Sequence, residues 1–336
     1  MTRRIKTPIL STAVILASLL SSTVFAQADT LKEAMTTAYV NNPSLEAARA
    51  SQRAIDETVN QATSGWRPSI IGTGSIARSD SSRTGVGFLP SNQITKPKSL
   101  AISIEQPIFR SFRTVNSTRE ARKQAEAGRA QLMNTEQQIF MATVASYSDV
   151  IRDETVLEST TNNVVALQRQ LQASEDRFEV GEITRTDVAQ SSARLSRAQS
   201  EKINAEAILT ASRAAYRRVV GDEPGTLERE IELPPLPASE EAAFDLASRN
   251  HPVILAAKAS EAAADYAVKK QYGGLGPEVT VGASYSKNWD GFIAGDTATA
   301  KTIQANLRVP LYQAGVQASV VRQAKQRRSQ FRMEAI

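Results

Sequence analysis

Few side chains of this sequence could carry out catalysis or hold a metal ion. The 336 residues include no cysteine and one histidine, His251. This excludes disulfides, thiolate metal sites, a cysteine nucleophile and a histidine-rich metal cluster. His251 precedes a proline in a turn-like pattern, and Glu240 with Glu241 is typical of a helix start, where the helix dipole favours negative charge. The stretch 72–74 (Gly-Thr-Gly) lacks the helix that a phosphate-binding loop needs. We therefore expect no catalytic residue, no metal site, no cofactor and no enzymatic activity.

The composition is that of an ordered chain with a small positive charge. Apolar residues make up 41% and charged residues 22%, which excludes disorder driven by composition. The formal net charge is +5, and three basic residues (Arg3, Arg4 and Lys6) lie near the N-terminus. Without them the surplus is too small for a protein that binds nucleic acid by charge.

Residues 1–26 have the pattern of a signal peptide. The three basic residues precede an apolar run over residues 9–20, which is too short to span a bilayer. Small residues then offer cleavage after Ala26 or Ala28, so the mature chain would begin near Gln27. A buried helix start fits the flanking residues less well. Export without an N-terminal cysteine for lipid attachment favours the envelope of a Gram-negative cell.

The chain contains an internal repeat. Three stretches match in order: residues 38–43 with 247–252, Pro68 with Pro277, and residues 104–109 with 307–312. The first two pairs are 209 residues apart and the third is 203 apart, so the second copy has the shorter loop. We expect a first structural repeat over residues 27–237 and a second over 238–336, each with the order helix, strand, loop, strand, proline, helix. The last helix of the second repeat should begin at residue 312.

Residues 68–109 and 277–309 predict two β-hairpins. Apolar and polar residues alternate, for example from Val279 to Tyr285 and from Ile303 to Val309, which indicates one apolar and one polar face. Runs of about 9 to 11 residues suit a tilted strand that crosses hydrocarbon. A half-buried sheet of a soluble protein is the alternative. Because the smallest membrane barrels have about eight strands, four strands would have to share a barrel with other chains.

Residues 112–219 predict a long helical hairpin, followed by a linker over 220–237. No proline interrupts residues 112–178, which as one helix would be a rod of ~100 Å. Apolar residues recur every seven positions from Val150 to Phe178, and the returning helix is rich in small residues that allow packing on more than one side. An antiparallel coiled-coil spacer is the alternative.

The turn of this hairpin has recognisable capping residues. Gly181 suits the C′ position after the first helix, and Thr184 or Thr186 suits the N-cap of the second. As a plain turn it needs no function.

This order of segments resembles the TolC-type outer-membrane efflux proteins over essentially the whole mature chain. The most specific matches are the strand-to-helix junctions at residues 106–109, with Pro107 and Phe109, and at residues 309–312, with Pro310 and Tyr312. The resemblance implies a mainly α-helical protein with membrane strands. In a homotrimer, each chain would give four strands to one 12-stranded outer-membrane β-barrel, and long coiled-coil helices would continue it as an α-barrel in the periplasm.

The resemblance also implies a passive conduit for small molecules or proteins. The protein would be the exit duct of a tripartite efflux pump or type I secretion system, opened by a periplasmic adaptor (membrane fusion) protein and an inner-membrane transporter. Val180, Gly181 and Glu182 would lie where adaptor hairpins make contact, with Glu182 in place of the leucine often found there. Thr186 and Asp187 would hold the turn closed through polar links to a neighbouring hairpin.

Two alternatives concern the class of protein and its length. A periplasmic adaptor also carries a long helical hairpin, but a compact β-domain flanks it. Compared with the first repeat, the second lacks on the order of 110 residues, including a second turn and returning helix. We therefore expect the 336-residue chain to be a C-terminally truncated channel, either a fragment of a longer gene product or a non-functional truncation.

Overall fold

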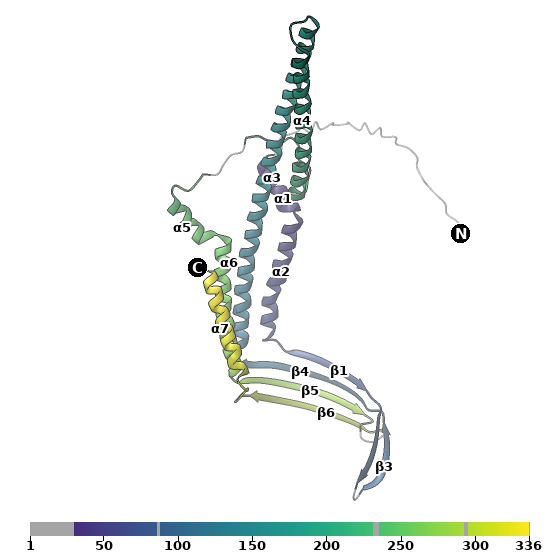
Figure 1. The fold of residues 1–336 in the computed structure, drawn as a ribbon. Coiled ribbons are helices and arrows are strands. Elements are labelled where there is room, and N and C mark those ends of the chain that lie inside the picture. Colours follow the sequence, from purple (N-terminus) through teal and green to yellow (C-terminus); the bar gives the residue numbers. More distant parts are fainter. Residues whose placement is uncertain (1–29, 86–87, 231–234, 292–294, 336) are drawn as a thin grey trace, which may run out of the picture. The chain divides into compact units, whose positions relative to one another are not determined.

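The computed structural model describes residues 30–85, 88–230, 235–291 and 295–335, so the predicted signal peptide lies outside the described residues. The chain divides into two units. One holds Tyr147–Arg217, and the other holds Met35–Ser146 and Glu232–Ile336, with short additional stretches in each. Within the described residues, helices predominate and four strands form the main sheet (Figure 1). The predicted fold class is confirmed.

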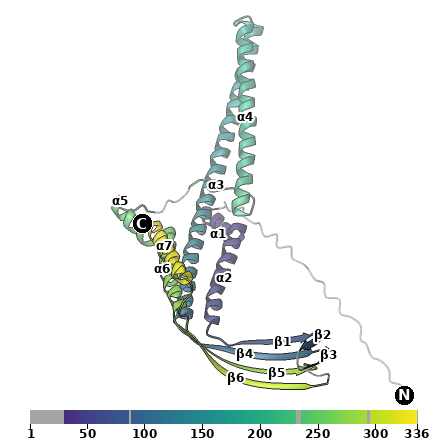
Figure 2. The ribbon, with the colours of Figure 1, turned by 60° about the horizontal axis from the view of Figure 1, so that its bottom comes forward.

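The four-stranded sheet belongs to the second unit. Its antiparallel strands lie side by side in the order β1-β4-β5-β6 (Figures 1 and 2). The strands are β1 (Ser69–Ile76), β4 (Lys98–Arg110), β5 (Glu278–Trp289) and β6 (Thr297–Arg308). Within the described residues, the edge strands β1 and β6 each pair along one side only. The two predicted hairpins are thus joined into one sheet by the pairing of β4 with β5.

The first hairpin contains a ribbon where the sequence predicts a loop. β2 (Ser79–Gly85) and β3 (Phe88–Thr95) pair as a separate two-stranded sheet. The loop prediction was wrong because these residues lack the apolar alternation that marks a half-buried strand. Their pairing satisfies backbone groups that a loop would leave to water.

The two hairpins of the main sheet pair in equivalent registers. In the first hairpin Ser69 is opposite Glu105, and in the second Glu278 is opposite Arg308. Glu278 lies 209 residues after Ser69, and Arg308 lies 203 residues after Glu105, so the two pairs are equivalent in the repeat. The sequence repeat is therefore also a repeat of backbone pairing.

Helices flank each hairpin in sequence. α2 (Pro43–Ser64) and α6 (Pro252–Tyr272) precede the hairpins, and α3 (Arg113–Glu179) and α7 (Val316–Glu334) follow them. Two short helices, α1 (Leu31–Asn41) and α5 (Glu240–Asn250), precede α2 and α6, and the 3₁₀ turn η1 (Gly273–Leu275) follows α6. α6 and α7 pack side by side (Figures 1 and 2). Among the helices that the structure describes, none combines the length and hydropathy needed to cross a bilayer.

Each repeat breaks its first helix at an N-cap followed by proline. Asn42 accepts hydrogen bonds through its side chain from the N–H groups of Ser44 and Leu45, and Nδ1 of His251 accepts one from Val253. Both caps have extended backbone, and the proline that follows needs no N–H partner at the first helical position. His251 is therefore a helix cap at a turn, as its match with Asn42 predicts.

A small apolar core joins the first helices to α3 within the second unit. Ala38 and Leu45 are fully buried and pack with Ile139, against which Leu132 also packs. Leu132 and Ile139 are seven residues apart, the spacing of a heptad, so they lie on the same side of α3 and both face this core.

The first unit is a helical hairpin with a narrow packed stripe. α3 ends at Glu179 and α4 (Arg185–Val220) returns, each within one residue of the predicted bounds. On α4 the buried and half-buried residues alternate by three and four from Val188 to Tyr216, the spacing of a coiled coil. Beside this stripe Ile203 and Ile208 remain exposed. The hairpin thus keeps apolar surface for contact with further helices.

Candidate functional site

The turn between α3 and α4, here called the tip (residues 177–188), begins with a Schellman motif. Gly181 has a φ of +81°. Its N–H donates to the carbonyl of Phe178, and the N–H of Glu182 donates to that of Arg177, each at 2.9 Å. A left-handed residue in this arrangement ends a helix and satisfies its last carbonyls. Gly181 occupies the C′ position that the sequence predicts.

The tip continues with a capping box that starts α4. The N–H and hydroxyl of Thr184 donate to Oδ2 of Asp187 at 2.9 and 2.7 Å, and the Asp187 N–H donates to the Thr184 carbonyl at 3.0 Å. These bonds favour the charged carboxylate, so Thr184 holds the pKa of Asp187 below its usual value. Of the two N-cap candidates, Thr184 is the cap. Oδ1 of Asp187 receives no hydrogen bond from the described residues.

The other predicted tip residues are exposed and are not brought together. Val180 is 72% exposed, Gly181 has open space around it, and Thr186 faces solvent in the first turn of α4. Glu182 forms an exposed salt bridge with Arg177 at 3.0 Å. No local pattern in the sequence points to Arg177, because its salt bridge with Glu182 closes across the turn.

Farther along the hairpin, a buried carboxylate connects α3 to α4. Asp153 accepts hydrogen bonds from Nε of Arg152, at 2.8 Å, and from the hydroxyl of Ser212 on α4. The bond from Arg152 contributes most to lowering the pKa of Asp153, against the effect of burial. A buried polar contact of this kind favours one axial register of two packed helices.

At the first strand-to-helix junction, β4 passes into α3 through a bulge and a left-handed bend. The pairing of β4 with β5 shifts between Pro107 and Phe109, since proline has no N–H to give to the ladder. Ser111 and Phe112 have φ values of 46° and 60°. The rings of Phe109 and Phe112 pack edge to face, with their centres 5.6 Å apart.

This junction is anchored to β5 by charge. Glu278 forms salt bridges with Arg110 at 2.6 Å and with Arg113 at 3.4 Å, and the Ser111 hydroxyl donates to the Pro277 carbonyl at 2.6 Å. The first repeat is thereby linked to the start of the second hairpin. The proline and aromatic residues of the junction predict it from the sequence. No pattern near Glu278 predicts that its carboxylate anchors this junction.

The second junction repeats the bend, and the helix begins later than predicted. Ala314 and Gly315 have φ values of 48° and 76°, in the positions equivalent to Ser111 and Phe112. The predicted helix start at residue 312 was wrong: α7 begins at Val316, because two left-handed residues cannot continue a right-handed helix. Pro310 and Tyr312 lie in the connection before this bend, with Tyr312 88% exposed.

The register of the main sheet separates apolar from polar side chains. Along β6, Ile303, Ala305 and Leu307 share one face with Ile102 and Ile104 of β4. The same face also carries Ile70, Leu100, Val281, Ala283 and Tyr285. Ile303 is 85% exposed and Leu307 is 67% exposed, so this apolar face is uncovered in the chain. Such a surface requires lipid or another protein to cover it, which is contrary to the alternative of a half-buried soluble sheet.

The opposite face of the sheet is polar. It is formed mainly by serine, threonine, asparagine and glutamine side chains, and it includes the charged residues Glu105, Glu278 and Arg308. Glu105 and Arg308 occupy equivalent positions of the two repeats, 203 residues apart. This face could line a water-filled passage.

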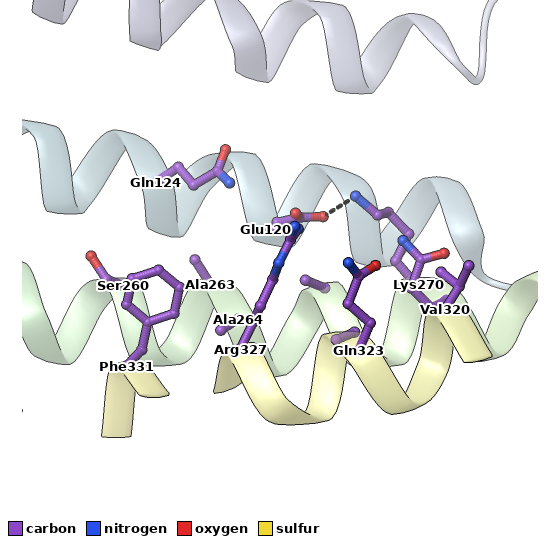
Figure 3. Close-up of a pocket in the computed structure, with 13 residues that line it drawn as sticks. Glu120, Gln124, Ser260, Ala263, Ala264, Lys270, Val320, Gln323, Arg327 and Phe331 are labelled. Atoms are coloured by element: carbon purple, nitrogen blue, oxygen red, sulfur yellow. Dashed lines mark ion pairs between the residues drawn. The ribbon is translucent and has the colours of Figure 1, made fainter. Parts of the chain in front are cut away.

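A groove of about 290 Å³ lies between α3, α6 and α7 (Figure 3). At its side Glu120 of α3 and Lys270 of α6 form a largely buried ion pair at 2.6 Å. No group of three or more histidine or carboxylate side chains in the described part of the chain could hold a metal ion. The groove therefore joins helices and offers no reactive constellation.

The comparisons with known proteins identify the family. A family model described as outer membrane efflux protein matches residues 34–222, which include the first hairpin, both long helices and the tip. The chain belongs to the outer membrane efflux protein family. This membership places the protein in the outer membrane with an extension into the periplasm, as predicted. It also separates the protein from the periplasmic adaptors. The predicted class of function, an outer-membrane efflux or secretion channel, is confirmed.

Individual relatives support this assignment along most of the chain. The outer membrane efflux protein BepC of Brucella suis is 35% identical over 324 residues, which cover 95% of this chain and 69% of BepC. The outer membrane protein TolC of Vibrio cholerae is 28% identical, over 91% of this chain and 70% of TolC. The outer membrane channel CmeC of Campylobacter jejuni has the same fold, with a TM-score of 0.77 at 13% identity over 91% of this chain and 66% of CmeC.

Proposed function

We propose that this chain assembles as a homotrimer and serves as the passive exit duct of a tripartite efflux pump or type I secretion system. The observation that carries the proposal is the main sheet, which in the described residues has one uncovered apolar face and an unpaired edge at each of β1 and β6. In hydrocarbon, each unsatisfied backbone group costs several kcal/mol, so a membrane sheet must close on itself. Four strands are below the roughly eight of the smallest membrane barrels, and three copies would give about twelve.

In this assembly the apolar face contacts lipid and the polar face lines the passage. Hydroxyl and amide side chains solvate a passing molecule without binding it at one place, as a conduit requires. The two structural repeats, 27–237 and 238–336, then supply equivalent parts of one wall. Pro107, Phe109, Pro310 and Tyr312 mark the level at which that wall changes from strand to helix.

The tip is the docking site for the periplasmic adaptor and the inner-membrane transporter, which supplies the energy. The exposure of Val180 and the open space at Gly181 support this role, since both are available to a helix laid against the hairpin. Glu182, paired with Arg177, adds charge at the edge of this surface.

The gate is formed by polar links from Thr186 and Asp187 to the neighbouring hairpin. The capping box uses Oδ2 of Asp187 and leaves Oδ1 for such a link. Exposed links of about 1 kcal/mol each are strong enough to favour closure and weak enough for a docking partner to reverse it.

The direct test is reconstitution of the protein expressed from its own gene. Outer membranes are isolated, and the protein is extracted and added to a planar lipid bilayer. We expect a trimer that resists dissociation in unheated detergent and conducts ions. Recovery of the protein as a soluble periplasmic species without conductance would refute the proposal.

A further inference from the structure

We propose that three lysines of the main sheet, Lys98, Lys287 and Lys301, bind the phosphate groups of a phosphorylated glycolipid in the outer leaflet of the membrane. This inference rests on the proposed function, in which the apolar face of the sheet contacts lipid. It deepens that function by assigning one class of lipid to one part of the face. The three residues are called the lysine row.

The lysine row lies towards the end of the sheet that is remote from the helices. α2 and η1 lead into β1 and β5, and β4 and β6 lead into α3 and α7, so all four connections to helices lie at one end of the antiparallel sheet (Figure 1). Ile76, Lys98, Trp289 and Thr297 lie side by side at the other end. In the proposed assembly the helices extend into the periplasm. This other end therefore faces the outer leaflet, and it is called the outer end.

The three lysines share the apolar face and follow one another diagonally across three strands. Lys98 of β4 is opposite Trp289, and Lys287 of β5 lies two residues before that tryptophan. Thr299 of β6 is opposite Lys287, and Lys301 lies two residues after that threonine. Such diagonal neighbours are ~7–8 Å apart, which is within the reach of long side chains. Two ammonium groups of the row can therefore donate charge-assisted hydrogen bonds to one phosphate group.

The lysine row has no matching negative charge on its own face. Among the described residues of the four strands, the apolar face holds no aspartate or glutamate, and the carboxylates of Glu105 and Glu278 belong to the polar face. Lys98 and Lys301 are exposed. Like charges at this spacing repel one another, so an anion bound between them would stabilise the row.

Two ordinary roles of lysines in sheets do not account for this placement. Lysines often protect an edge strand from pairing with other chains, but Lys98 and Lys287 lie on the central strands β4 and β5. A lysine that only has to reach water could lie at either end of the face, yet Val279 and Leu307 occupy the end near the helices. The positive charge therefore faces only the outer leaflet, which in a Gram-negative outer membrane consists mainly of phosphorylated glycolipid.

Aromatic side chains and a hollow lie beside the row. Trp289 and Tyr285 share its face, and such rings favour the headgroup level of a membrane. Nζ of Lys287 lies 5.1 Å from the centre of the Trp289 ring, which favours an ammonium group at this level. A hollow of about 800 Å³ at the outer end has the size of a small-molecule site. Its lining residues from the apolar face are Gly74, Ile76, Lys98, Leu100, Trp289 and Thr297.

Two aspartates also line the hollow, and both are engaged in the turn between β5 and β6. Oδ1 of Asp290 accepts a hydrogen bond from the N–H of Gly295 at 2.6 Å, and Oδ1 of Asp296 accepts one from the N–H of Gly291 at 2.8 Å. These bonds hold the carboxylates to the backbone of the turn, beyond the last residues of the strand face. The lysines therefore determine the charge of the face itself.

Competition between lipids tests the site without changing the protein. The full protein is extracted from outer membranes as a trimer. Its affinity is measured for lipid A that carries two phosphates, for the same lipid A after enzymatic removal of both, and for phosphatidylglycerol. We expect the phosphorylated lipid A to bind most tightly, and inorganic phosphate not to displace it. Equal affinity for either of the other lipids, or displacement by inorganic phosphate, would overturn the inference.

Removal of charge tests the residues themselves. Lys98→Gln, Lys287→Gln and Lys301→Gln together should weaken the binding of lipid A on the order of 100-fold, because each lysine near an anionic lipid surface contributes roughly fivefold to affinity. Arginine at the same three positions should preserve the binding. The matched control removes the same charge from α3, α4 and α6 and should bind as the unmodified protein does: Lys123→Gln, Lys202→Gln and Lys258→Gln.

The outcomes separate this inference from the proposed function. A glutamine variant that forms a conducting trimer and binds lipid A as tightly as the control would overturn the inference and leave the proposed function intact. If that variant forms no trimer, the comparison of phosphorylated with dephosphorylated lipid A on the unmodified protein decides. Recovery of the unmodified protein as a soluble species without conductance would overturn both.

Discussion

Asp187 is the most informative residue to perturb, because the proposed gate gives its two carboxylate oxygens separable roles. Oδ2 closes the capping box with Thr184, whereas Oδ1 is available to a neighbouring hairpin. Asp187→Ala removes both interactions. Thr184→Ala removes the capping partner and leaves the carboxylate in place, so it is the matched control.

The expected magnitudes follow from the cap that the structure shows and from the links proposed between copies. Loss of the capping box should destabilise the start of α4 by about 1 kcal/mol in either variant. Loss of the link to the neighbouring hairpin occurs at every copy, so about 1 kcal/mol per exposed link becomes about 3 kcal/mol for a trimeric gate that opens as a unit. That free energy corresponds to a change on the order of 100-fold in the ratio of open to closed channels.

Single-channel recording in planar bilayers measures this ratio directly. Asp187→Ala should raise the open-to-closed ratio by about two orders of magnitude, and Thr184→Ala should change it by less than about tenfold. If the two variants open the channel equally, the cap alone controls the gate. If neither opens it, Asp187 has no part in closure.

The same carboxylate sets the pH dependence of the tip. Because Thr184 lowers the pKa of Asp187, the contribution of the carboxylate to the cap is complete above the ordinary aspartate pKa of ~3.9 and is lost only as the pH falls through the lowered value. Closure should therefore be constant from neutral pH down to about pH 5. Thr184→Ala should shift the acid-induced loss to higher pH, as measured by conductance against pH.

Three further predictions follow from the faces of the sheet and the geometry of the tip. Ile303→Lys should reduce the yield of membrane trimer, with a cost of about 2 to 4 kcal/mol for a lysine facing lipid near the midplane, whereas Gln304→Lys on the polar face should assemble normally on unheated gels. In a salt gradient, Glu105→Gln should shift the reversal potential towards anion selectivity, and Arg308→Gln should shift it towards cation selectivity. Equal reversal potentials in the two variants would place these side chains outside the passage. Gly181→Ala should loosen the tip by about 1 to 2 kcal/mol, because an alanine must adopt a left-handed backbone there, and hydrogen exchange of the tip amides should rise; unchanged exchange would contradict that strain.

The sequence was sufficient for the features that depend on local periodicity. The long helices, the four strands of the main sheet and the break at His251 each follow from spacing, capping or alternation within a short window. The junction prolines were recognisable because proline restricts its own backbone, and Gly181 was recognisable because glycine adopts a left-handed backbone without strain.

Features held by distant partners could not be predicted in this way. The ribbon of β2 and β3 has no apolar alternation, so pairing alone reveals it. The anchor at Glu278 joins residues more than 160 positions apart, and the late start of α7 depends on two left-handed residues, one of which, Ala314, is an unusual choice for that conformation. Asp187 was singled out by resemblance and Thr184 as one of two N-cap candidates, whereas the bond between them comes from the structure.

The central claim is that one face of the main sheet contacts lipid while the other lines water. Single cysteines placed along β6 from Thr302 to Leu307, in a chain that otherwise has none, can be reacted with a membrane-impermeant maleimide in intact outer membranes. We predict labelling with a period of two: Thr302, Gln304 and Asn306 react, and Ile303, Ala305 and Leu307 are protected. Uniform labelling at all six positions would contradict a membrane-embedded barrel and place the strand in a soluble domain.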